Sequence, residues 1–265
     1  MFEDWIRAGS GQKLLSAVIL AALSIASAQG AAITVGPEGC DYGSIQGAVE
    51  AADPGDTITV EGGTYKENVI VDKSLVLRGK GSGEGRPVID GNGVGSAVLL
   101  AADRITLEGF IVKNAGFGKA GIEVKSDKNF IRNNLVTANR WYGISLSDSQ
   151  ENVITGNVVS SNKYGIWISS GSSSSTIAQN QLEKNANGNA VDAGRNGWEG
   201  NAYDDLEEGE TRYGIAGGSK DDDSPKPLAP GSGKDDALDS TSRRPSRHQL
   251  ESITIDCAAR GTRQV

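Results

Sequence analysis

The sequence is poor in the side chains that most often build catalytic and metal sites. Its 265 residues contain one histidine (His248), one methionine (Met1) and two cysteines. His248 lies in a polar C-terminal stretch, so the body of the chain has no imidazole for acid–base chemistry. An epimerase-like site, which would combine Tyr, His and Asp, is therefore excluded from the body.

Positive charge is scarce as well. The chain has 26 Lys and Arg against 34 Asp and Glu, a net charge of -8. A nucleic-acid partner requires a basic surface that neutralises phosphates, so we expect none. Most of the excess acid lies between residues 204 and 239, which leaves the body only mildly acidic.

Long apolar runs are absent apart from one near the N-terminus, Leu14 to Ala28. This run is short and rich in small residues, which disfavours a membrane span. Arg7 and Lys13 precede it, and it ends on an A-x-A-like cleavage site at residues 26–28. We predict that residues 1–30 are a signal peptide and that the protein is exported to the periplasm, the cell surface or the medium. Membrane contact would then require an uncleaved signal.

Export would allow the two cysteines to form a disulfide. Cys40 lies at the start of the folded part and Cys257 near the end of a polar tail. A bridge between them would require the tail to fold back along the chain. We therefore expect Cys40 to be a small buried residue and Cys257 to be an unpaired thiol.

The region from Asp127 to Ala190 repeats itself. Ile131, Ile154 and Ile177 are each 23 residues apart. Apolar residues alternate in YGISL (142–146) and YGIWI (164–168), which is the period of strands and excludes leucine-rich or helical repeats. Short strands, breaks rich in Asn, Gly and Ser, and a 23-residue period predict a parallel β-helix.

Equivalent residues of successive coils then stack about 4.8 Å apart. The Ile series becomes an interior column. Two Asn series at the same period are candidates for ladders of amides that hydrogen-bond along the axis, and we predict a structural role for them. They are Asn134, Asn157 and Asn180, and Asn139, Asn162 and Asn185.

The two ends of the repeat also carry signals. Ser44 to Ala52 has helical spacing and predicts a short helix that caps the first coil. Residues 56–203, divided by a period of 23, give about six coils, and Trp198 and Tyr203 are placed to plug the far end. We predict an all-β, right-handed parallel β-helix over residues 31–203, followed at 204–265 by a polar, disordered tail.

Three segments together resemble the NosD-like right-handed β-helix family of the pectin-lyase-like group, whose units are called carbohydrate-binding and sugar-hydrolysis repeats. They are SIQGAVEAADPGDTITVEGGTYKENVIVDKSLVLRG (44–79), the paired N-x-x-x-x-N and YGIxL units, and NGWEGNAY (196–203). The resemblance covers about residues 33–203. It implies an extracytoplasmic location and, for many members, contact with polysaccharide.

The family name comes from proteins tied to copper delivery for nitrous oxide reductase. A copper site requires clustered His, Cys or Met ligands, which the body lacks. We therefore predict no metal and no cofactor, and a copper-delivery accessory remains as a third alternative only through the family name.

Convergent catalytic groups are equally hard to find. A glycoside hydrolase needs paired carboxylates, but Asp204-Asp205 and residues 221–223 lie off the strands and indicate a solvated spacer. A lyase needs a base with a neutralising cation, and the basic residues of the regular coils are scattered without an acidic cluster. They are Lys125, Lys128, Arg132, Arg140 and Lys163. We expect no catalysis, with a polysaccharide lyase or hydrolase as the alternative.

The outward face remains as a candidate site. If Ile144 and Ile166 point inward, their neighbours point outward, and an exposed Trp beside polar groups can stack on a sugar ring. Tyr142 and Tyr164 are expected to point inward. The candidate ligand-binding residues are Glu123, Lys125, Trp141, Ser145, Asp148 and Trp167. We predict a monomeric carbohydrate-binding and structural module. The alternative is that the two Trp residues only cover the coil edge.

Overall fold

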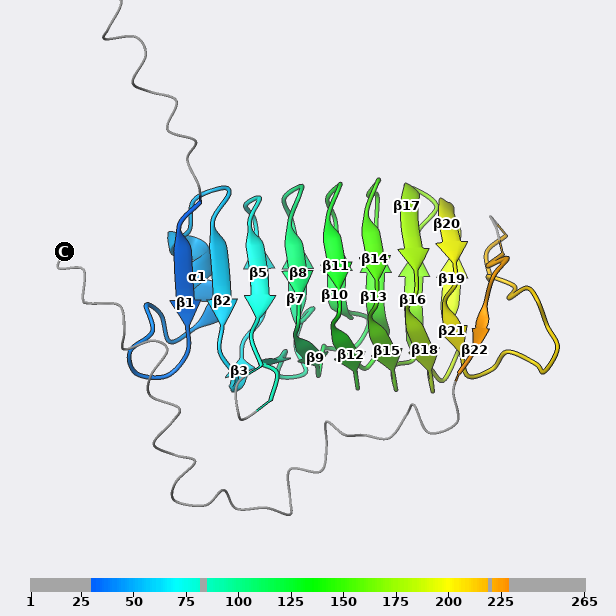
Figure 1. Cartoon of the computed structure of the whole chain (residues 1–265), viewed down its shortest axis with the longest axis horizontal. Helices are drawn as coiled ribbons and strands as arrows, with labels where there is room; N and C mark the ends of the chain where they lie inside the picture. The colour runs from blue at the N-terminus through cyan, green and yellow to red at the C-terminus, as the bar shows by residue number, and fades with distance from the viewer. Residues whose placement is uncertain (1–29, 82–84, 219–220, 229–265) are drawn as a thin grey trace, which may run out of the picture.

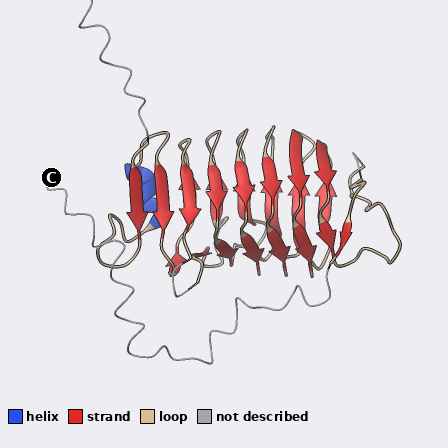
Figure 2. Cartoon of the chain, viewed as in Figure 1, coloured by secondary structure: helices blue, strands red, loops and turns tan. Residues whose placement is uncertain are grey.

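The computed structural model describes residues 30–81, 85–218 and 221–228. This part of the chain is a parallel β-helix in which three sheets run along a stack of coils, with a single short helix at the N-terminal end (Figures 1 and 2). The predicted all-β class is confirmed. The predicted signal peptide and Cys257 lie outside the described residues.

Each regular coil contributes one strand to each sheet. Sheet A contains β1 (Ala32–Val35), β2 (Thr57–Val60), β5 (Val76–Gly79), β8 (Thr106–Glu108), β11 (Phe130–Arg132), β14 (Val153–Thr155), β17 (Ser173–Ala178) and β20 (Arg195–Glu199). Sheet B contains β3 (Thr64–Lys66), β6 (Val88–Asp90), β9 (Ile111–Lys113), β12 (Leu135–Thr137), β15 (Val158–Ser160), β18 (Gln181–Glu183), β21 (Ala202–Tyr203) and β22 (Lys226–Pro227). Sheet C contains β4 (Val69–Val71), β7 (Val98–Leu100), β10 (Ala120–Val124), β13 (Tyr142–Leu146), β16 (Tyr164–Ile168) and β19 (Ala190–Asp192).

The stack is longer than the sequence predicts. Sheets A and B each contain eight strands, which gives about eight coils where about six are predicted. β1 precedes the predicted first coil, and β22 pairs with β21 beyond the predicted last one. A Lys-Pro dipeptide such as β22 carries no strand pattern, because proline is depleted in strands and cannot donate a backbone hydrogen bond.

The fold therefore continues past Tyr203. The ring of Tyr213 stacks on that of Tyr203, with centroids 3.6 Å apart and planes at 5°. Ile215 is buried, and Ala216 forms a parallel bridge with Val191. The prediction of a disordered tail is wrong for residues 204–218 and 221–228, which cover the C-terminal end of the coils.

The helix α1 (Ile45–Ala51) covers the N-terminal end, as predicted. Its N-cap is Ser44, whose hydroxyl accepts a hydrogen bond from the backbone of Gly47. Gln46 accepts a hydrogen bond from the backbone N–H of Ile70, at the edge strand of sheet C. The helix buries Ile45, Ala48 and Val49 against the first coils. It therefore hides the core and satisfies part of an exposed sheet edge.

Cys40, just before this helix, is half-buried and disulfide-bonded. The prediction that Cys40 is a buried, unpaired residue is therefore wrong. The chain's other cysteine is Cys257.

The interior consists of aligned apolar columns. Ile131 pairs with Ile154 and Ile154 with Ile177, and all three are fully buried. In the next coil Trp198 takes the equivalent position, opposite Ile177. Trp198 is 5% exposed, so this large ring fills the interior at the last strand of sheet A, as predicted.

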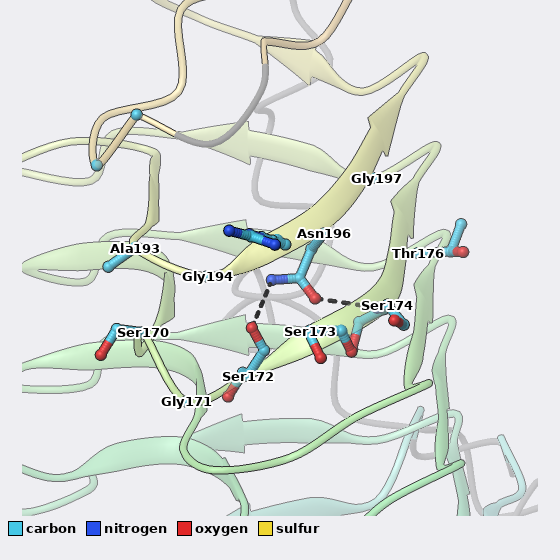
Figure 3. A pocket seen from close by; sticks show the side chains of 14 residues that line it. Ser170, Gly171, Ser172, Ser173, Ser174, Thr176, Ala193, Gly194, Asn196 and Gly197 are labelled. Atoms are coloured by element: carbon cyan, nitrogen blue, oxygen red, sulfur yellow. Dashed lines mark hydrogen bonds between the residues drawn. The ribbon is translucent and has the colours of Figure 1, made fainter.

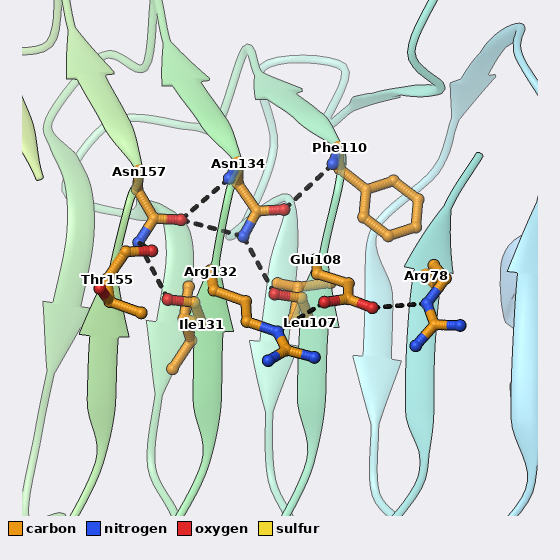
Figure 4. Close-up of polar contacts among 9 residues, drawn as sticks. All are labelled: Arg78, Leu107, Glu108, Phe110, Ile131, Arg132, Asn134, Thr155 and Asn157. Atoms are coloured by element: carbon orange, nitrogen blue, oxygen red, sulfur yellow. Dashed lines mark hydrogen bonds and ion pairs between the residues drawn. The ribbon is translucent and has the colours of Figure 1, made fainter. Parts of the chain in front are cut away.

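An asparagine ladder runs along one corner of the coils (Figure 4). The backbone N–H and the side-chain Nδ2 of Asn134 both donate to Oδ1 of Asn157, at 3.0 and 3.1 Å. Asn157 bonds in the same way to Asn180, and Asn180 to Asn201. The backbone N–H of Phe110 donates to Asn134 at the start of the ladder. All four amides are at least 99% buried, so they satisfy corner backbone groups that water cannot reach.

Two more ladders follow the other corners. Asn139, Asn162 and Asn185 form one by the same pair of hydrogen bonds. Asn129, Asn152, Ser175 and Asn196 form the other. The residue before most ladder positions has a positive φ, between 53° and 66°. These residues are Lys128, Asn133, Ala138, Glu151, Gly156, Ser161, Ser174, Gln179, Lys184 and Gly200. A left-handed residue followed by an inward amide is the common corner geometry.

The first ladder ends on a carboxylate. Asp222 is fully buried and accepts hydrogen bonds from the backbone and side chain of Asn201, at 3.0 and 2.9 Å. It also accepts from the backbones of Gly200 and Ser224 and from the Tyr203 hydroxyl. Each amide of the ladder donates to the next coil, so the last one needs an acceptor, and the two oxygens of the Asp222 carboxylate supply it. The prediction that Asp222 lies in a solvated spacer is wrong.

The other ladders end in the same way. Asn185 donates to Asn189, whose Nδ2 donates to the carboxylates of Asp204 and Asp205 at 2.9 and 2.7 Å. In the third ladder Nδ2 of Asn196 donates to the buried carboxylate of Asp192. Two of the three terminal acceptors thus come from the segment after Tyr203, which explains how that segment is held.

An ion-pair row on the outside of sheet A joins the three successive strands β5, β8 and β11 (Figure 4). The carboxylate of Glu108 accepts from Nε of Arg78 and from Nε of Arg132, each at 2.5 Å. Burial acts to raise the pKa of Glu108, but the two hydrogen bonds and positive charges outweigh it and lower the pKa. Both arginines are about half exposed, so the row contributes little to stability.

Replacing Asn157 by Ala should lower the free energy of unfolding by about 3 kcal/mol, because it leaves several buried donors and acceptors without partners. Urea unfolding measures the change. The control is Asn187→Ala, at an exposed position outside the ladders, which should cost about 0.5 kcal/mol or less. Equal, small effects of the two substitutions would contradict a structural ladder.

Asp222→Asn should destabilise the C-terminal end, because the new amide brings donors into a site made only of donors. We expect a loss of about 2–3 kcal/mol in urea unfolding. Asp223→Asn is the matched control, since Asp223 is exposed and pairs with Arg212 at the surface. If the two variants unfold alike, Asp222 does not anchor the ladder.

Candidate functional site

Three of the predicted site residues form one outward column on sheet C. Glu123 pairs with Ser145, and Ser145 with Trp167. Their neighbours Ile144 and Ile166 are fully buried, so the column faces away from the core. Since adjacent strands lie about 4.8 Å apart, Glu123 and Trp167 are separated by about 10 Å across the sheet.

Five aromatic side chains gather on the outer face of sheet C and just before its strands, and we call them the aromatic platform. The ring centroid of Tyr142 lies 5.1 Å from that of Trp167 and 5.8 Å from that of Tyr164. Trp141 lies 6.2 Å from Tyr142 and 4.6 Å from Phe117, in edge-to-face contact with both. The platform therefore spans three successive coils and contains both predicted Trp residues.

The prediction that Tyr142 and Tyr164 point inward is wrong. A Cβ on Gly143 would meet Cγ1 of Val159 at 2.5 Å, so Gly143 faces the interior, and so does the next residue, Ile144. Two consecutive inward residues reverse the alternation and turn Tyr142 outward. The Tyr-Gly pair repeats at 164–165, which is the sequence signal for this reversal.

The platform is accessible, and it has a cationic rim. Phe117 is 73% exposed, and Trp141 and Trp167 are each partly exposed. Nζ of Lys163 lies 3.3 Å from the ring centroid of Trp141, a cation–π contact that covers one face of the indole. Packing between Phe117 and Lys163 thus fixes the orientation of Trp141.

The polar residues predicted for the site are arranged less simply. Ser145 is only 5% exposed, so its hydroxyl is not presented to a ligand. Asp148 is exposed, but it lies beyond the end of β13, away from the aromatic platform. The structure therefore brings Trp141 and Trp167 together and leaves Ser145 and Asp148 outside their cluster.

Glu123 and Lys125 are engaged with each other. Nζ of Lys125 lies 2.8 Å from the carboxylate of Glu123, which also accepts a hydrogen bond of 2.6 Å from the Ser96 hydroxyl. Burial acts to raise the pKa of Glu123, but these hydrogen bonds and the charges of Lys125 and Lys119 outweigh it and lower the pKa. Glu123 is therefore an ionised acceptor at neutral pH and a poor general acid.

A polar groove of about 1040 Å³ opens beside the platform, beyond the ends of β16 and β19 (Figure 3). Its walls are the serines of residues 170–175, and its floor includes Gly194 and Asn196. The side chain of Asn196 bonds to the backbone of Ser172 and Ser175 and so belongs to the wall structure. Arg195 is the cation of the groove, a residue that the sequence analysis does not single out.

The described residues do not fit a metal site. No group of three or more His, Cys, Asp or Glu side chains within 30–81, 85–218 and 221–228 could hold a metal ion. Histidine and methionine are absent from these ranges, and Cys40 is disulfide-bonded. Soft ligands for copper are thus missing from the coils.

A family model described as "Periplasmic copper-binding protein (NosD)" matches residues 50–219. The match spans 170 residues (219 − 50 + 1), well over half of the chain. The chain belongs to the NosD family. This family is periplasmic by description, and no helix in the described part of the chain is long and apolar enough to cross a bilayer.

A similar solved structure is ORF18 of Geobacillus virus E2, with 15% sequence identity and a TM-score of 0.48. The match covers 77% of this chain but only 46% of the viral protein. Among curated proteins, none matches the chain.

Lys125→Met should raise the pKa of Glu123 toward the usual glutamate value, because it removes the hydrogen bond and the charge that hold the carboxylate ionised. NMR titration of the Glu side-chain carbons measures the shift. Since the native pKa is depressed, the contribution of Glu123 to stability is present at neutral pH and is lost as the pH falls through that pKa. Lys128→Met, next to Glu151 instead, should leave Glu123 unchanged. A Glu123 pKa that is unaltered by Lys125→Met would contradict the assignment.

Proposed function

We propose that this NosD-family protein is an exported, non-catalytic module that binds a glycan through the aromatic platform of sheet C. The observation that carries the proposal is the gathering of scarce aromatics. The chain has four Phe, four Trp and six Tyr, fourteen in all, and five of them form one outward cluster. Aromatics that only filled the interior would not be left partly exposed together on one face.

The chemistry of the platform suits sugars. The apolar faces of a pyranose ring pack on aromatic rings, while its hydroxyls require donors and acceptors at the edge. Tyr142 and Trp167 provide neighbouring rings at 34° to each other, and Tyr164 adds a phenol that accepts a hydrogen bond from Asn187. Lys163 and the Glu123–Lys125 pair supply polar groups at the rim.

Binding without catalysis is favoured by the positions of the acids. Hydrolysis of a glycosidic bond uses two carboxyl groups that flank it, one of them protonated. Glu123 is held ionised by Lys125. Asp192 and Asp222 are buried as acceptors at the ends of the ladders. These acids already have structural roles and do not converge on the platform.

Copper binding, which the family's description suggests, is not supported by the residues of the coils. The ligand types that copper prefers are Met1, His248 and Cys257, which lie outside the described residues, and the disulfide-bonded Cys40. The proposal therefore places the function of the coils in their aromatic face.

A glycan array followed by calorimetry on the full chain tests the proposal. Trp167→Ala should weaken binding about tenfold or more, equivalent to about 1.4 kcal/mol. Phe130→Ala is the control, because Phe130 is also partly exposed but lies on sheet A. Analysis of products on every bound polymer adds a second readout. Unsaturated or reducing ends among the products would show a lyase or a hydrolase and contradict the binding module. Equal losses of affinity in Trp167→Ala and Phe130→Ala would contradict a site on sheet C.

A further inference from the structure

The polar groove exists because adjacent coils have turns of unequal length between sheets C and A. Leu146, Ile168 and Asp192 align in sheet C, and Ile154, Ile177 and Trp198 align in sheet A. The chain takes 8 steps from Leu146 to Ile154, 9 from Ile168 to Ile177, and 6 from Asp192 to Trp198. The third turn is thus three residues shorter than the second, which leaves a step in the surface at residues 193–197.

The extra length of the second turn has a defined conformation. Ser173 pairs with Arg195 and Thr176 with Gly197, so β17 contains a bulge between these pairs. Ser174, within the bulge, has a φ of 59°. Bulges re-aim side chains and are enriched next to binding sites. Here the bulge forms the serine wall of the groove (Figure 3).

The groove offers both hydrogen-bond donors and acceptors. Within the described residues, no carboxylate forms an ion pair with Arg195, so its guanidinium donors are available. The carboxylate of Asp148 borders the groove, since a Cβ on Gly171 would meet its Oδ1 at 2.0 Å. Together with the hydroxyls of the more exposed serines, Ser170, Ser173 and Ser174, these groups match a polyol, which both donates and accepts at each hydroxyl.

The groove begins close to the aromatic platform along the chain. Trp167 lies one residue before the end of β16, and the groove begins at Ser170. Three residues of extended chain span about 10 Å, and the six from Tyr164 to Ser170 about 20 Å. One extended ligand that lies along β16 would therefore reach both places.

We propose that the groove is a second subsite for the same glycan, so that the ligand is an oligosaccharide lying along β16. One end stacks on the aromatic platform, and the hydroxyls of the other end bond to Arg195, Asp148 and the serine wall. This inference rests on the proposed function. It adds that affinity depends on chain length, and it assigns a binding role to Arg195.

Calorimetry with two series of oligomers tests the subsite. The probes are cello-oligosaccharides and oligogalacturonides, each from disaccharide to hexasaccharide, the first series neutral and the second anionic. With the wild-type full chain, affinity should rise with length in at least one series. Arg195→Gln should reduce affinity for the hexasaccharide of that series about tenfold and leave its shortest bound member within about twofold.

The controls separate the two proposals. Arg104→Gln removes an equal charge at an exposed position away from both places and should change nothing. Ser170→Ala is a second groove variant and should weaken the long oligomer selectively. If Arg195→Gln lowers the affinity for short and long oligomers equally, or lowers neither affinity, the groove is not a subsite, and the proposed binding at the platform is unaffected. If no oligomer of either series binds, the proposed function fails and the groove fails with it.

Discussion

The structure depends on how buried polar groups at the coil corners are satisfied. Each turn of the chain between two sheets brings backbone N–H groups inside, where water cannot reach them, and an inward amide from the next coil accepts their hydrogen bonds. This arrangement requires a hydrogen-bond partner in every following coil and an acceptor in the last coil. Asp222, Asp192 and the Asp204–Asp205 pair fulfil that requirement, so the segment after Tyr203 is part of the fold.

The same constraint decides where the surface can vary. Inward columns and ladder corners must keep their register from coil to coil, because a shifted residue would leave both neighbours without partners. Outward positions and the turns between sheets C and A do not need to keep this register. The aromatic platform is built from outward positions, and the groove with its bulge at Ser174 is built from the turns between sheets C and A. The features that can recognise a ligand therefore sit on the parts of each coil that the interior does not specify.

The sequence predicts the interior, which keeps a fixed register, better than the outer positions and turns, which vary. The Ile column, the Asn series and the capping helix are visible because they repeat at a fixed period or have helical spacing. Asp222 was missed because it follows Asn201 by 21 residues and replaces an amide by an acid. The outward position of Tyr142 was missed because Gly143 reverses the alternation, an effect of close packing against Val159 that composition does not reveal. Arg195 lies in the groove because of a step between two turns, and this step is visible only in the folded coils.

We propose that these coils act through their aromatic face and not through a metal centre. The most direct test of this proposal is an NMR titration of the tryptophan indole N–H resonances with the glycan that the array selects. The indoles of Trp141 and Trp167 are partly exposed on the platform, whereas the Nε1–H of Trp198 is buried and bonded to Asp192. If the glycan binds to the platform, the Trp141 and Trp167 signals should shift saturably while that of Trp198 stays unchanged. Saturable glycan binding that leaves both platform indoles unmoved would contradict this proposal.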